Sequence, residues 1–99
     1  MSDNVKISPN VCSYPDEKHE NLNIEIELPG VKKENIELLI HEDSFYVVAT
    51  KEGVDFLGSY SICCPVKPEK ARAKYENGLL KVTVPYKNPF EDAISVKIE

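Results

Sequence analysis

The sequence has no tryptophan, one methionine and three cysteines, and it contains no long apolar run. Crossing a bilayer takes about 18–20 consecutive apolar residues, so a transmembrane helix is excluded. Residues 1–10 are polar and lack the apolar stretch of a secretory signal, so we expect none. A small, odd number of cysteines does not form the disulfide framework typical of secreted domains. These absences predict a protein of the reducing cytoplasm.

Positive charge is also scarce, because 12 basic residues are interleaved with 17 acidic ones and the net charge is −5. Nucleic-acid binding needs clustered lysine and arginine, so a nucleic-acid partner is not expected. An anionic membrane surface is disfavoured for the same reason. The 41% hydrophobic and 29% charged content is typical of a folded soluble protein, and 99 residues suffice for one domain.

Alternation of apolar and polar residues recurs along the chain, whereas helical periodicity is lacking. In Leu22–Leu28 every second residue is apolar, which is typical of a strand with one buried face. Similar patterns predict further strands at 36–41, 45–50, 59–64, 71–75 and 80–84, with a weaker one at 11–14. Short strands at this spacing favour an all-β fold in which two antiparallel sheets form a sandwich.

Turn signals separate the predicted strands. Pro29-Gly30 ends the first strong strand, and Glu42-Asp43-Ser44 indicates a hairpin. The polar segment 51–55 is predicted to be a loop, and Asn77-Gly78 suits the positive φ angles of a two-residue hairpin turn. We therefore divide the chain into a short flexible arm at 1–10, the sandwich at 11–86 and a C-terminal extension at 87–99.

The adjacent cysteines Cys63 and Cys64 are the strongest candidates for chemistry in the sequence, although ordinary packing and surface thiols explain them more simply. On the predicted strand their side chains point to opposite faces, so one thiol should be buried and the other exposed. No Cys-x-x-Cys redox motif is present, and Cys12, His19 and His41 are scattered. We expect no metal, no cofactor and no enzymatic activity, with a redox or metal protein built on the two cysteines as the lesser alternative.

Two motifs resemble the α-crystallin domain of small heat-shock proteins. The first is Leu28-Pro29-Gly30-Val31 with the charged residues and Ile36 that follow it, and the second combines Ala73, Asn77, Gly78 and Leu80. Each lies where that family has it, and the resemblance covers residues 11–86. The terminal Ile94-Ser95-Val96 and Val96-Lys97-Ile98 resemble the family's C-terminal I-x-I/V motif.

This resemblance implies an immunoglobulin-like β-sandwich and an ATP-independent chaperone, or holdase, that binds unfolding client proteins. It also implies that the C-terminal motif docks in a groove between two edge strands, which match 36–41 and 71–75 here. The expected groove residues are Leu38, Ile40, Ala71 and Ala73, and the docking residues are Ile94, Val96 and Ile98. Self-association through the tail is then expected. The alternative is that the tail forms a last strand of its own sandwich.

The sequence departs from the resemblance in two places. Microbial small heat-shock proteins carry a long segment that supplies a strand swapped between partners, but only residues 51–58 are available here. The family's long N-terminal arm is reduced to about ten residues. Both departures favour an alternative function as a co-chaperone-like adaptor that binds one folded partner, such as another chaperone.

Overall fold

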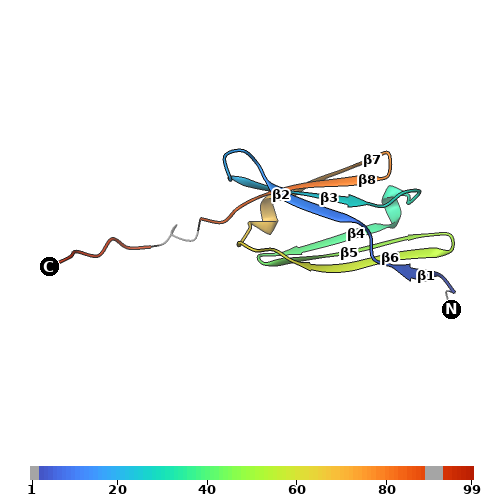
Figure 1. The fold of residues 1–99 in the computed structure, drawn as a ribbon, viewed down its shortest axis with the longest axis horizontal. Helices are drawn as coiled ribbons and strands as arrows, with labels where there is room; N and C mark the ends of the chain where they lie inside the picture. Colours follow the sequence, from blue (N-terminus) through green and yellow to red (C-terminus); the bar gives the residue numbers. More distant parts are fainter. Residues whose placement is uncertain (1–2, 89–92) are drawn as a thin grey trace.

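The computed structural model describes residues 3–88 and 93–99 and shows a two-layer β-sandwich (Figure 1). Its strands are β1 Val5–Ile7, β2 Val11–Pro15, β3 Asn21–Glu27, β4 Ile36–His41, β5 Ser44–Lys51, β6 Val54–Ser61, β7 Arg72–Glu76 and β8 Leu79–Pro85. Two short 3-10 turns, η1 Lys33–Asn35 and η2 Pro68–Lys70, connect the sheets. No helix among the described residues is long and apolar enough to span a bilayer.

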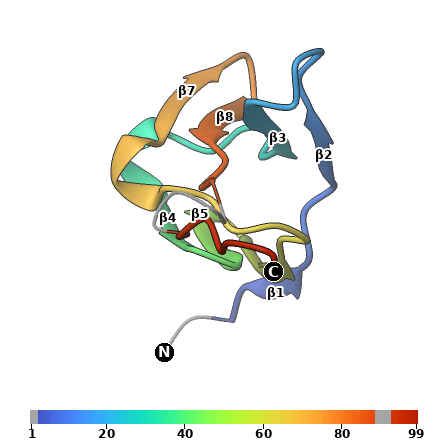
Figure 2. The same ribbon diagram turned by 90° about the vertical axis from the view of Figure 1, so that its left-hand side faces the viewer.

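Each sheet has four strands. One has the order β1-β6-β5-β4 and the other β2-β3-β8-β7, and every neighbouring pair is antiparallel except β1 and β6. The predicted all-β sandwich is therefore confirmed. Viewed end-on, β4 lies below β7 on one side of the sandwich, and β1 lies below β2 on the other (Figure 2). The sandwich thus has two open sides, each formed by one edge of each sheet.

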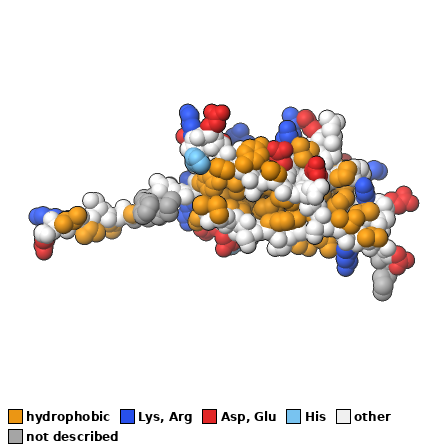
Figure 3. Space-filling view, in the orientation of Figure 1, with side chains coloured by type: hydrophobic (Ala, Val, Ile, Leu, Met, Phe, Trp, Pro, Cys, Tyr) orange, Lys and Arg blue, Asp and Glu red, His pale blue; other side chains and the backbone are white. Residues whose placement is uncertain are grey.

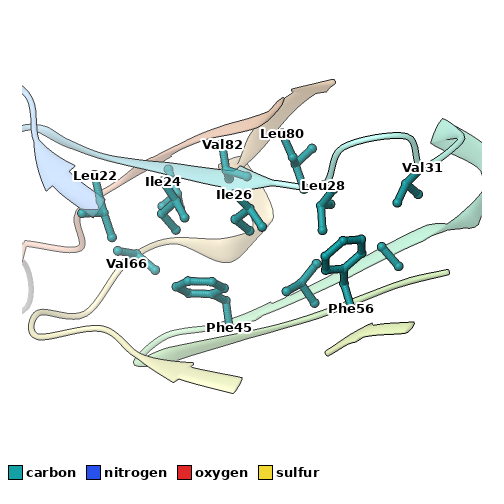
Figure 4. Packing of buried hydrophobic residues seen from close by; sticks show 13 residues of the cluster. Leu22, Ile24, Ile26, Leu28, Val31, Phe45, Phe56, Val66, Leu80 and Val82 are labelled. Carbon is teal, nitrogen blue, oxygen red and sulfur yellow. The ribbon is translucent and has the colours of Figure 1, made fainter. Parts of the chain in front are cut away.

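The core lies between the sheets, and the alternation seen in the sequence creates it. In β3, Leu22, Ile24 and Ile26 are buried, whereas the intervening polar side chains face outward. Phe45 and Phe56 approach them from the other sheet (Figure 4). The core between the two sheets consists of the buried side chains of Leu22, Ile24, Ile26, Leu28, Val31, Phe45, Val47, Ala49, Phe56, Val66, Leu80, Val82 and Val84.

The region after β5 differs from the sequence prediction. The loop predicted at 51–55 is wrong, because β5 runs to Lys51 and β6 begins at Val54, leaving only Glu52-Gly53 as the turn. The strand predicted at 59–64 begins five residues earlier and ends at Ser61, which pairs with the first residue of β5. Without a partner strand beyond that pair, Cys63 and Cys64 lie in a bend and both are exposed. The prediction that one thiol is buried is therefore wrong.

The N-terminal segment contains a strand that the sequence analysis missed. Residues Val5–Ile7 lie within the predicted arm, yet they form β1 and pair with Val54–Phe56 of β6. Residues 8–10 then cross to the other sheet, where the main-chain N–H of Glu27 donates to the carbonyl of Asn10 over 2.9 Å.

The C-terminal extension contains no strand among its described residues. In Figure 1 residues 93–99 lie away from the sandwich. Part of the predicted extension, residues 89–92, falls outside the described residues.

Candidate functional site: a groove between two edge strands

Strands β4 and β7 form the edges of the two sheets on one side of the sandwich. The inward-facing residues of β4 are Ile36, Leu38 and Ile40, because they pair with the core residues Ala49, Val47 and Phe45 of β5. All three are only half-buried, since no further strand covers them. A partly open apolar seam is the expected property of facing edge strands.

The seam opens into a hollow of about 210 Å³ near η1 and the first half of β4. The hollow brings together Leu38 and Ala73, as the sequence analysis predicted, and Leu80 also lines it. Ile36 and Tyr75 line it too, but the sequence analysis missed them. Ile36 lies two residues from Leu38, and Tyr75 lies two residues from Ala73, each on the same strand face. The alternation in β4 and β7 could therefore have identified both residues.

The other two predicted groove residues line other hollows. Ile40 lines a neighbouring hollow of about 340 Å³ together with Val66, Pro68 and Lys87. Ala71 lines a third hollow on the outer face of the β2-β3-β8-β7 sheet, with the outward-facing Arg72 and Thr83 among its neighbours. The four predicted residues therefore do not share one hollow. The turn η2 crosses this side of the sandwich between the sheets (Figure 2).

The two sequence motifs meet at one end of the groove. The main-chain N–H of Leu28 donates to the carbonyl of Gly78 over 2.7 Å. Asn77 and Gly78 have φ angles of 50° and 80°, which confirms the predicted turn with two positive φ angles. A β-carbon at position 78 would lie 3.1 Å from the Cα of Pro29, so this approach needs glycine.

Tyr75 connects these motifs to the groove. Its ring lines the hollow, and its hydroxyl lies 2.7 Å from the carbonyl oxygens of both Leu28 and Val31. The single hydroxyl proton is donated to one carbonyl at a time. This contact fixes the turn between β3 and η1 against β7. The family motifs therefore build the wall of the groove.

Charged side chains border the groove without dominating it. The Lys87 ammonium lies 3.5 Å from the Glu42 carboxylate, and both residues are exposed. Such surface pairs contribute about 0–1 kcal/mol. His41 Nδ1 lies 3.2 Å from the Asp43 carboxylate, and this contact lowers the pKa of Asp43. His19 is exposed, and no three potential metal ligands converge within residues 3–88 and 93–99.

The opposite side of the sandwich exposes apolar side chains between the sheets (Figure 3). Hollows of about 490 and 570 Å³ flank residues 8–10, where this segment crosses from β1 to β2. Tyr60 stacks on Phe45 with ring centroids 5.0 Å apart, and its hydroxyl donates to the Pro9 carbonyl over 3.3 Å. The sequence analysis missed this second opening because it assigned the crossing segment to a flexible arm.

The tail residues Ile94, Val96 and Ile98 are not packed on the sandwich. Their side chains are 86%, 79% and 94% exposed, and residues 93–99 form no strand. The alternative in which the tail is a last strand of its own sandwich is therefore wrong. The sandwich therefore leaves these three apolar side chains uncovered.

The fold and its two open sides define an α-crystallin-type sandwich, and comparison with known proteins agrees. The model of the Hsp20/alpha crystallin family matches residues 15–99, so the chain belongs to this family of small heat-shock proteins. A probable 15 kDa heat shock protein of Leptospira interrogans is 24% identical over 107 residues, which cover 94% of this chain and 81% of that protein.

Solved structures show the same fold at low sequence identity. Heat shock protein 16.0 of Schizosaccharomyces pombe superposes with a TM-score of 0.75 at 20% identity, covering 95% of this chain and 77% of that one. A small heat-shock protein of Xylella fastidiosa gives 0.72 at 12% identity, with 96% and 97% covered. The similarity therefore extends over nearly the whole chain.

Proposed function

We propose that this protein is an ATP-independent holdase that covers exposed apolar segments of unfolding proteins and limits their aggregation. One observation carries the proposal: an open apolar groove and an exposed apolar tail occur in the same chain with matching spacing. Membership of the Hsp20/alpha crystallin family supports a chaperone role. Binding of this kind needs neither catalysis nor a cofactor.

The spacing of the tail matches the spacing of the groove. Leu38 and Ile40 are two residues apart on β4 and line neighbouring hollows. In extended backbone, side chains two residues apart on one face are separated by roughly 6.4–6.8 Å. Ile94 with Val96, or Val96 with Ile98, presents the same spacing. An extended tail can therefore place one apolar side chain in each hollow, as in strand-like peptide recognition.

Docking of this kind is weak and reversible. Burying one isoleucine or valine contributes about 1.5–3 kcal/mol. Fixing the backbone of each tail residue costs about 1–2 kcal/mol, which offsets much of that gain. A client segment with alternating apolar residues can then replace the tail. Occupation of the groove of a second copy would produce the self-association that we propose.

The open edges provide a second source of affinity. Strands β2, β4 and β7 each have one unpaired edge, and β1 covers only Val54–Phe56 of β6. Unfolding chains expose backbone N–H and C=O groups that can pair with such edges whatever their sequence. This favours a broad range of clients. The free thiols of Cys12, Cys63 and Cys64 fit a reducing compartment, and we include the cytoplasm in the proposal.

The proposal is tested by light scattering of a heated model protein in the presence of increasing amounts of this chain without ATP. We expect suppression near equal mass. The variant Leu38→Ser should weaken suppression severalfold, because it removes an apolar wall of the groove. Leu39→Ser is the matched control, since Leu39 is the next residue on β4 and its side chain, 54% exposed, points to the outer face.

Circular dichroism and thermal melting must show that both variants remain folded. Suppression that is absent in the folded wild-type chain would contradict the holdase and favour the adaptor that binds one folded partner. Equal activity of the two variants would show that the groove does not bind clients.

A further inference from the structure

Cys63 and Cys64 form an exposed pair of thiols in contact. Their sulfur atoms lie 3.2 Å apart, and both side chains are exposed in the bend after β6. A disulfide bond is about 2.03–2.05 Å long, so the two sulfur atoms touch without being bonded. The function proposed above uses neither thiol.

The fold holds this bend at both ends. On one side, the N–H of Ile62 donates to the carbonyl of Asp43 over 2.7 Å. On the other, the N–H of Val66 donates to the carbonyl of Glu42 over 2.9 Å, and the Val66 side chain is fully buried. Between these anchors, Pro65 has a fixed φ and restricts the backbone of the residue before it. The two thiols are therefore brought together by the structure of the bend.

The two sulfur atoms share a hydrogen bond in which either thiol can be the donor. The hydrogen bond with Cys63 raises the pKa of Cys64 above its ordinary value. A thiol with a raised pKa is less often the thiolate near neutral pH, and the thiolate is the nucleophile. Attack on an external disulfide begins at whichever of the two sulfur atoms is ionised, and the neighbouring thiol then resolves the mixed disulfide.

We propose that Cys63 and Cys64 are a redox modification site at which a small disulfide, such as glutathione disulfide, converts the two thiols into a disulfide between neighbouring residues. The thiolate of one cysteine attacks one sulfur of glutathione disulfide, and one glutathione thiolate leaves. The other cysteine then loses its proton and attacks the sulfur of the first, which releases the second glutathione. Two cysteine thiols are oxidised, one glutathione disulfide is reduced, and two reduced glutathiones carry away the two hydrogens.

The exposure of the pair and the geometry of neighbouring residues make this disulfide a reversible one. A disulfide between adjacent cysteines needs strained local geometry, and strain makes the bond easier to reduce. Strained or exposed disulfides have the more oxidising potentials that are typical of labile, regulatory sites. The pair is therefore expected to stay reduced in the resting cytoplasm and to oxidise when the glutathione pool becomes oxidised.

The test uses the full chain carrying Cys12→Ser, which leaves only the pair. The folded protein is equilibrated with mixtures of oxidised and reduced glutathione, then denatured, alkylated and analysed by intact mass. We expect a species that has lost two hydrogens, takes up no alkylating group and carries no glutathione. Cys63→Ser and Cys64→Ser, each added to Cys12→Ser, should instead keep one glutathione as a mixed disulfide.

The same titration in denaturant measures what the fold contributes. Since the bend already holds the two sulfur atoms in contact, the folded chain should oxidise at a glutathione ratio lower by on the order of tenfold. Equal ratios for folded and unfolded chains would overturn the proposal that the structure builds this site. Glutathione retained on the Cys12→Ser chain, or disulfide-linked dimers on a non-reducing gel, would also overturn it. None of these measurements depends on chaperone activity.

Discussion

Asp16 holds the turn between β2 and β3 together through one exposed carboxylate. Its oxygens accept hydrogen bonds from the side-chain amide of Asn21 over 2.9 Å and from the N–H of Glu20 over 2.8 Å. The hydrogen bond from Asn21 is the main cause that lowers the pKa of Asp16 below 3.8. The ionised carboxylate is therefore favoured in the folded state over the unfolded chain.

A lowered folded-state pKa has a definite consequence for stability. The Asp16 contribution is complete above the unfolded pKa near 3.8 and is lost as pH falls through the lower, folded pKa. We expect Asp16→Asn to lower the free energy of unfolding at neutral pH, and this difference from wild type to shrink below about pH 4. Urea denaturation of both chains across this range measures it. A difference independent of pH would show that the charge of Asp16 plays no part.

Among the elements, the hairpin turns matter most for the geometry of the site. Gly53 and Gly78 occupy two such turns with almost the same φ, 83° and 80°. Their surroundings differ, because a β-carbon at Gly53 would have no neighbour within 4 Å, whereas one at Gly78 would press against the backbone of Pro29. Comparing alanine substitutions at Gly53 and Gly78 therefore separates the destabilisation caused by the backbone conformation from the destabilisation caused by the close contact.

We expect Gly53→Ala to lower the free energy of unfolding by about 1–2 kcal/mol, the cost of a left-handed conformation for alanine. Gly78→Ala should lower the free energy of unfolding by this amount and by a further amount of about 1–3 kcal/mol, because the added β-carbon overpacks the contact with Pro29. Chemical denaturation of both variants checks the order. Equal losses would show that the β7–β8 turn moves away from Pro29 at little cost, and that the motif contact does not hold the groove wall.

The sequence alone predicted most elements but not all of their ends. Seven strands and the Asn77-Gly78 turn follow from alternation and turn residues, because burial of one face requires that pattern. Strand β6 was misplaced since Asp55 and Gly58 interrupt its apolar alternation, and only pairing with β5 fixes its extent. Strand β1 was missed because Val5–Ile7 is three residues long, is exposed, and gains order only by pairing with β6.

The candidate site was predictable to a similar degree. Leu38 and Ala73 meet in one hollow because strand matching placed both on facing edges. Ile40 lines a separate hollow beside η2 and Ala71 lines one on the outer face of its sheet, since nothing in the sequence indicates how the connection through η2 lies against the two sheets. The contact between the Cys63 and Cys64 thiols was also hidden, because it depends on a bend fixed by hydrogen bonds to the β4–β5 turn.

For the whole molecule, the open question is what fills the grooves. If tails dock in the grooves of other copies, replacing Ile94, Val96 and Ile98 together with serine should reduce the mass measured by multi-angle light scattering. The folded domain should be unaffected, since all three side chains are exposed. Lys97→Ser in the same tail is the control and should keep the wild-type mass. An unchanged mass for the triple variant would exclude docking between copies.

The two-residue turn between β5 and β6 has a consequence for how copies separate. Within residues 3–88 and 93–99, every strand pairs with strands of its own chain, and the Glu52-Gly53 turn is too short to lend a strand from this loop to a neighbour. If copies associate through their tails as proposed, a copy can therefore leave an assembly by withdrawing its tail, while its own sandwich stays folded. Such a departure would break the contacts between tail and groove and would leave every strand pair of the sandwich in place.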